Sequence, residues 1–75
     1  MQLDAIAVFA EVARLKSFTE AGLALNAPLS TVSRKVSELE ASLGTRLIDR
    51  SKRQIRLTEA GTTYYDLCRK GFFFF

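Results

Sequence analysis

The 75-residue chain is long enough for one small domain with a modest hydrophobic core. Its hydrophobic content of 48% is typical of a folded chain and excludes an intrinsically disordered one. The single cysteine excludes an internal disulfide, and the lack of histidine argues against a zinc site, so we expect no cofactor. The N-terminus lacks the pattern of a signal peptide, and no apolar run reaches membrane-spanning length. We therefore expect a cytoplasmic protein without a membrane partner.

Charge is unevenly distributed along the chain, whose net charge is +3. Residues 1–33 carry a net charge of −1, residues 34–56 carry +4, and residues 57–75 are balanced. Concentrated positive charge attracts a polyanion. The middle of the chain is therefore where we expect such a partner to bind.

Three helices are predicted in the first 43 residues. Residues 1–16 have a broad apolar face at helical spacing, which is typical of core scaffold. The run from Ser17 to Glu20 is typical of a capping box that begins a short second helix. Asn26 suits a left-handed cap at its end, and Pro28 suits the entrance to a third helix. This order predicts a helix-turn-helix, although two helices joined in this way are also a common packing device.

The stretch 28–43 combines one apolar face with a polar face rich in donors. The apolar positions at helical spacing are Val32, Val36, Leu39 and Leu43. The other face carries Ser30, Thr31, Ser33, Arg34, Lys35 and Ser37, followed by the acids Glu38 and Glu40. A helix with short donors and a cation at its leading end suits the DNA major groove. Taken alone, the stretch also fits an ordinary amphipathic helix with a solvated polar face.

Gly44 is suited to end this helix, and two strand candidates follow it. Residues 47–50 and 54–57 predict a β-hairpin wing, since the second run alternates polar and apolar residues. Arg50, Lys52 and Arg53 gather around its tip. A charged turn can simply be solvated, but beside a helix-turn-helix this cluster favours contact with phosphates or the minor groove.

Thr58 is the predicted N-cap of a last helix. Two apolar stripes run along that helix, one with Ala60, Tyr64 and Leu67 and one with Tyr65, Cys68 and Phe72. A small domain cannot cover both stripes, so we expect a partner chain there. The closing residues 72–75 are four phenylalanines without periodicity, and we assign them no function.

The runs SFTEAGLALN, STVSRKVSELEASLGTRLIDR and LTEAG resemble the N-terminal DNA-binding domain of LysR-type transcriptional regulators. The resemblance covers about residues 2–70. It implies a mainly α fold, with a winged helix-turn-helix of three helices and a two-stranded β wing in residues 1–58. The motif would span about residues 19–38 and the wing about 47–57. Residues 59–75 would begin a linker helix through which two subunits form a homodimer, and the effector-sensing domain is absent from this chain.

Four positions depart from the family pattern. Leu29 stands where the family often has a glutamine that reads bases, and it can offer only an apolar contact, such as one to a thymine methyl. Pro28 replaces a hydroxyl residue at the helix entrance, while Ile48 and Gly22 replace phenylalanine and alanine.

We expect the chain to bind double-stranded DNA in a sequence-specific manner, as the DNA-binding part of a LysR-type regulator of transcription. The residues expected to contact DNA are Thr19, Leu29, Ser30, Thr31, Ser33, Arg34, Lys35, Arg50, Lys52 and Arg53. Arg34 is the best candidate for a base contact, and Arg53 for the minor groove. Thr31 and Ser33 suit phosphate contacts.

Two other functions make different predictions. A winged-helix protein-interaction module that does not bind DNA would tie Arg34 into buried ion pairs and fold the wing away from the helix. An enzyme is not expected, because the chain has no histidine, no cysteine paired with a base and no glycine-rich phosphate loop.

Overall fold

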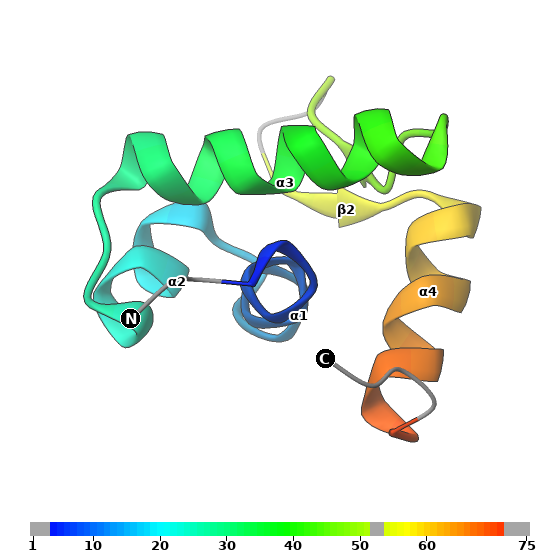
Figure 1. The fold of residues 1–75 in the computed structure, drawn as a ribbon, viewed down its shortest axis with the longest axis horizontal. Helices are drawn as coiled ribbons and strands as arrows, with labels where there is room; N and C mark the ends of the chain where they lie inside the picture. Colours follow the sequence, from blue (N-terminus) through cyan, green and yellow to red (C-terminus); the bar gives the residue numbers. More distant parts are fainter. Residues whose placement is uncertain (1–3, 52–53, 72–75) are drawn as a thin grey trace.

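The computed structural model describes residues 4–51 and 54–71. Within these ranges the elements are the helices α1 (Ala5–Leu15), α2 (Phe18–Leu25), α3 (Leu29–Leu43) and α4 (Glu59–Arg69), and the strands β1 (Ile48–Asp49) and β2 (Arg56–Leu57) (Figure 1). The predicted fold, mainly helical with a two-stranded wing, is confirmed. None of the helices in the described ranges is long and apolar enough to cross a membrane. Lys52, Arg53 and residues 72–75 lie outside the described residues.

Local capping chemistry sets the ends of α2 and α3. The Ser17 hydroxyl accepts a hydrogen bond from the Glu20 backbone N–H at 3.0 Å, which confirms Ser17 as the N-cap of α2. Asn26 ends α2 with a φ of 55°, and Gly44 ends α3 with a φ of 70°. Both residue types tolerate this left-handed backbone. Pro28 holds the N-cap position of α3 without a side-chain hydrogen bond.

The hydrophobic core lies between α1, α2, α3 and β1. Its buried apolar residues are Val8, Phe9, Val12, Ala13, Ala21, Val32, Val36, Leu39, Leu47 and Ile48. In Figure 1, α1 is seen nearly end-on beneath the middle of α3, and α2 lies beside it. Leu43 was predicted on the buried stripe but is 43% exposed, because α1 does not reach the last turn of α3.

Thr58 and Gly61 join α4 to the start of the wing. The Thr58 backbone N–H donates to the Leu47 carbonyl at 3.0 Å, and its hydroxyl donates to the Arg46 carbonyl at 2.6 Å. The same hydroxyl accepts from the Gly61 N–H at 2.9 Å, so the predicted N-cap is confirmed. A Cβ on Gly61 would overlap the Leu47 carbonyl oxygen, and therefore only glycine permits this approach.

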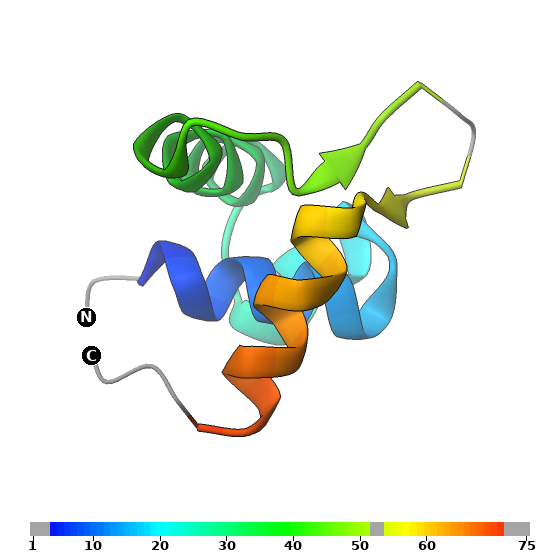
Figure 2. The ribbon, with the colours of Figure 1, turned by 90° about the vertical axis from the view of Figure 1, so that its right-hand side faces the viewer.

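The two strands are shorter than the predicted runs and pair in antiparallel fashion, with Ile48 opposite Leu57 and Asp49 opposite Arg56. They project away from the helices, while α4 crosses in front of α1 (Figure 2). The Phe9 and Tyr64 rings meet edge to face, with centroids 5.8 Å apart. The wing therefore emerges beside α3, and α4 is fixed to the core of the same domain.

Candidate nucleic-acid interface

The outer face of α3 carries most of the predicted contact residues. Leu29 is 52% exposed, and Ser30, Arg34 and Ser37 are also exposed. The half-buried members are Thr31, Ser33 and Lys35. The first half of α3 therefore offers hydroxyl groups, a guanidinium and one large apolar side chain at its surface.

A depression of about 600 Å³ lies between the start of α2, the start of α3 and the wing. The residues lining it are Lys16, Ser17, Phe18, Thr19, Leu29, Ser33, Arg50, Gln54 and Ile55. It brings together the predicted contact residues Thr19, Leu29, Ser33 and Arg50 from three parts of the sequence. We call it the α3–wing depression.

Lys16 and Gln54 line the same depression and were not predicted as contact residues. Lys16 closes α1 in a left-handed conformation with a φ of 54°. The sequence signal for Lys16 was a cation next to the α2 cap, whereas nothing in the sequence distinguished Gln54. Lys16 comes from the turn between α1 and α2 and Gln54 from the wing, so the two meet only in the folded domain.

Arg34 forms an ion pair with Glu38 one turn further along α3, at 3.0 Å. The two side chains are 59% and 52% exposed. Exposed pairs of this kind contribute about 0–1 kcal/mol, so an anion from outside can replace Glu38 at little cost. The protein-interaction alternative predicted a buried ion pair for Arg34, and this pair is not buried.

Glu40 was predicted on the polar face of α3 but is buried, with a side chain only 7% exposed. One carboxylate oxygen, Oε2, accepts hydrogen bonds from the backbone N–H groups of Leu47 and Ile48, at 2.8 and 3.1 Å. The prediction was wrong because these donors come from β1 and the residue before it, which fold back over α3. Glu40 thereby fastens the wing to the helix.

Arg50 is held by partners within the domain. Its Nη2 atom lies 3.5 Å from Oε1 of Glu40, and its guanidinium lies 5.2 Å from the centroid of the Phe18 ring. Its side chain is 33% exposed. Arg50 therefore lines the α3–wing depression and also joins β1 to α2 and α3.

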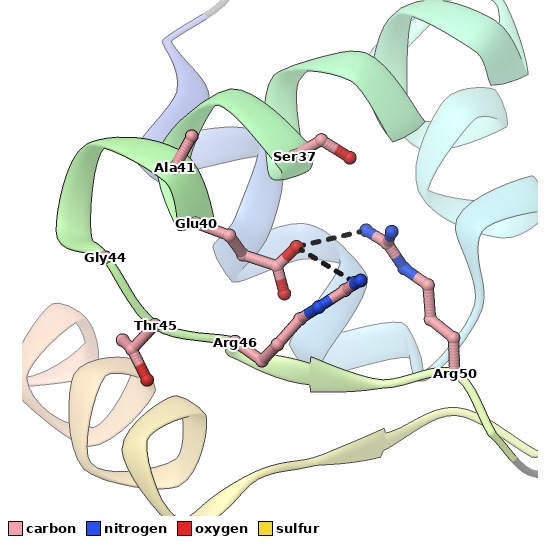
Figure 3. Close-up of a pocket in the computed structure, with 7 residues that line it drawn as sticks. All are labelled: Ser37, Glu40, Ala41, Gly44, Thr45, Arg46 and Arg50. Atoms are coloured by element: carbon pink, nitrogen blue, oxygen red, sulfur yellow. Dashed lines mark hydrogen bonds and ion pairs between the residues drawn. The ribbon is translucent and has the colours of Figure 1, made fainter.

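A second depression, of about 490 Å³, lies along the last turns of α3 (Figure 3). The residues lining it are Ser37, Glu40, Ala41, Gly44, Thr45, Arg46 and Arg50. Arg46 and Arg50 both point toward Glu40 in this view.

The predicted wing contacts Lys52 and Arg53 fall outside the described residues. No group of three potential metal ligands occurs in the part of the chain that the structure describes.

Comparison with known proteins identifies the arrangement. Residues 3–62 match the family model described as bacterial regulatory helix-turn-helix protein, lysR family. An HTH-type transcriptional regulator of Xanthomonas campestris is 48% identical over 63 residues, which are 84% of this chain and 18% of the relative. The HTH-type transcriptional activator AaeR of Escherichia coli is 45% identical over 69 residues, which are 92% of this chain and 22% of that protein. Both relatives are transcriptional regulators rather than enzymes.

A solved structure has the same fold and carries DNA. The DNA-binding domain of BenM, in a crystal structure with catB site 1 DNA, superposes with a TM-score of 0.87 at 30% identity. The match covers 96% of this chain and 80% of that chain. This chain spans about a fifth of the length of the two curated relatives, at 18% and 22%.

Proposed function

The chain belongs to the lysR family of bacterial regulatory helix-turn-helix proteins and corresponds to the DNA-binding domain of that family. From this premise we propose how the chain binds DNA. We propose that α3 enters the major groove of a duplex and that the wing contacts the neighbouring backbone and minor groove. The observation that carries this proposal is the open α3–wing depression, which four predicted contact residues line together. The BenM domain that shares this fold is in complex with DNA.

The first half of α3 supplies the base contacts in this proposal. Arg34 exchanges Glu38 for the edge of a base, since a guanidinium suits the two acceptors of guanine. Leu29 and Ser30 lie five and four residues before it, a little more than one turn, and are both exposed. Leu29 then offers an apolar surface to the methyl group of thymine.

The remaining predicted residues position the domain on the backbone. Thr19, Thr31 and Ser33 present hydroxyls to phosphates, and Lys35 adds a cation. At the wing, Lys52 would contact phosphate and Arg53 would reach the minor groove. These contacts set the register of α3 in the groove but carry no sequence information.

A shift assay on a duplex selected from a random pool tests the proposal. Arg34→Ala should weaken binding about 5- to 150-fold on the selected site, the range for one good base contact. Arg53→Ala should also weaken it. The control is Arg14→Gln, since Arg14 lies on α1 in an exposed pair with Glu11 and should change affinity less than about twofold. Unchanged affinity in both test variants would overturn the assigned contacts.

We further propose that residues 59–75 pair with the same segment of a second copy, while residues 1–58 bind DNA. A depression of about 480 Å³ along α4 is lined by Glu59, Ala60, Thr63, Tyr64 and Leu67. A two-fold dimer would place two α3 helices about 34 Å apart, or a multiple of this distance. Sedimentation equilibrium should show a dimer, and selected sites should be palindromic. A monomer that selects a single half-site would contradict this.

In the whole protein we propose that this binding regulates transcription in the cytoplasm, in response to a sensing domain outside this chain. The names of the curated relatives support this role.

A further inference from the structure

Two arginines share a single buried carboxylate at the end of α3 (Figure 3). Oε2 of Glu40 is already occupied by two backbone N–H groups. Its other oxygen, Oε1, lies 3.5 Å from Nη2 of Arg50 and 3.8 Å from Nη1 of Arg46. One negative charge thus faces two guanidinium groups, and the cluster keeps a net positive charge.

Arg46 is the less engaged of the two arginines. Its side chain is 70% exposed, compared with 33% for Arg50. A separation of 3.8 Å is too long for a hydrogen bond, so Glu40 attracts Arg46 without taking up its donors. A guanidinium has five N–H donors in a planar fork, which matches the oxygens of a phosphate.

Hydroxyl residues line the same depression as this guanidinium, although the Thr45 hydroxyl points away from it in Figure 3. Ser37 and Thr45 line the same depression, and both residues are exposed. Ser37 lies one turn after Ser33, which lines the α3–wing depression, and Arg50 lines both depressions. The four residues from Ser33 to Ser37 rise about 6 Å along the helix axis. A DNA strand that passes Ser33 can therefore continue past Ser37 toward Arg46.

We propose that Ser37 and Arg46 form a seat for one backbone phosphate of the duplex, next to the base pairs that the first half of α3 contacts. This inference rests on the proposed DNA binding. In the seat, Arg46 supplies the charge and the Ser37 hydroxyl supplies a further donor, while Glu40 keeps the guanidinium over the depression. Such a contact adds affinity without sequence preference.

Arg46→Gln tests the seat by its effect on salt dependence. Neutralising one phosphate contributes about 0.9 to the slope of log K against log salt, so Arg46→Gln should lower that slope by about one. The affinity of Arg46→Gln for DNA should fall about tenfold or more, because a hydrogen bond to a charged group is lost. The loss should be equal for selected and unrelated duplexes. Arg46→Lys should keep the slope.

Arg14→Gln is the matched control, since it also removes one exposed arginine with an acidic partner, from α1. The Arg46 side chain can be changed without loss of the fold, because Thr58 binds the backbone oxygen of Arg46. The urea midpoint of Arg46→Gln should therefore match that of Arg14→Gln.

Three results would overturn the seat. The first is an unchanged salt slope in Arg46→Gln while Arg34→Ala still loses affinity, which leaves the proposed function intact. The second is a loss confined to the selected duplex, which would make Arg46 a base contact. The third is saturable binding of inorganic phosphate at Arg46 with no effect of the substitution on duplex binding, which would make it a site for a free anion.

Discussion

Removing the carboxylate of Glu40 should detach the wing from α3 and destabilise the whole domain. In Glu40→Ala, the backbone N–H groups of Leu47 and Ile48 lose their acceptor in a buried position. Each unsatisfied buried donor costs about 1–3 kcal/mol, so the two together cost about 2–6 kcal/mol. Arg46 and Arg50 add little to this sum, because each can turn toward solvent.

This cost is a large share of the stability available to the domain. A chain of this length has a free energy of unfolding of about 4–11 kcal/mol. Glu40→Ala should therefore unfold at much lower urea, or be largely unfolded in buffer. Glu40→Gln keeps one acceptor oxygen but loses the charge, and should cost about 1–2 kcal/mol.

Urea unfolding followed by circular dichroism measures both variants. Glu38→Ala is the control, since Glu38 is also an acid of α3 but is 52% exposed in its pair with Arg34. We expect that variant to stay within about 1 kcal/mol of the parent. If Glu40→Ala were as stable as Glu38→Ala, the carboxylate would not fasten the wing and the reasoning would be refuted.

Four further predictions use other parts of the domain. Gly61→Ala should cost about 3 kcal/mol or more in urea unfolding, because its Cβ would overlap the Leu47 carbonyl oxygen. Burial raises the pKa of Tyr64 above its usual value, so stability should fall as pH rises through the unfolded pKa of about 10, and Tyr64→Phe should reduce that fall. Burial also raises the pKa of the Cys68 thiol, and iodoacetamide at pH 8 should label it more slowly in buffer than in urea. Replacing thymine by uracil at a contacted step should weaken binding about fourfold for the parent and leave Leu29→Ala unchanged, since one methyl contact is worth about 0.8 kcal/mol.

The helix ends of this fold could be predicted because their causes are local. Ser17, Asn26, Gly44 and Thr58 act on backbone groups within a few residues of themselves. Each therefore leaves a signal in a short window of sequence. The whole helix-turn-helix follows from these ends and from the apolar spacing between them.

The burial of Glu40 could not be predicted in the same way, because its partners are seven and eight residues away in an irregular connection. One signal was available: Glu40 follows Val36 by four residues, on the face of α3 that is otherwise apolar. A carboxylate at such a position indicates buried donors from elsewhere in the chain. The exposure of Leu43 was likewise set by the reach of α1, which no local pattern of α3 contains.

The surroundings of each cation in residues 34–56 also determine whether it is available to a phosphate. Residues 34–56 contain seven cations, yet the structure gives three of its arginines different surroundings. Arg34 is paired with the exposed Glu38, whereas Arg50 is held between Glu40 and Phe18. Arg46 lies between these cases, close to Glu40 but 70% exposed. A phosphate must displace existing partners to bind Arg50, so its share of the salt slope should be smaller than that of Arg46. A charge count along the sequence would therefore overstate the number of phosphates that residues 34–56 neutralise in the proposed complex.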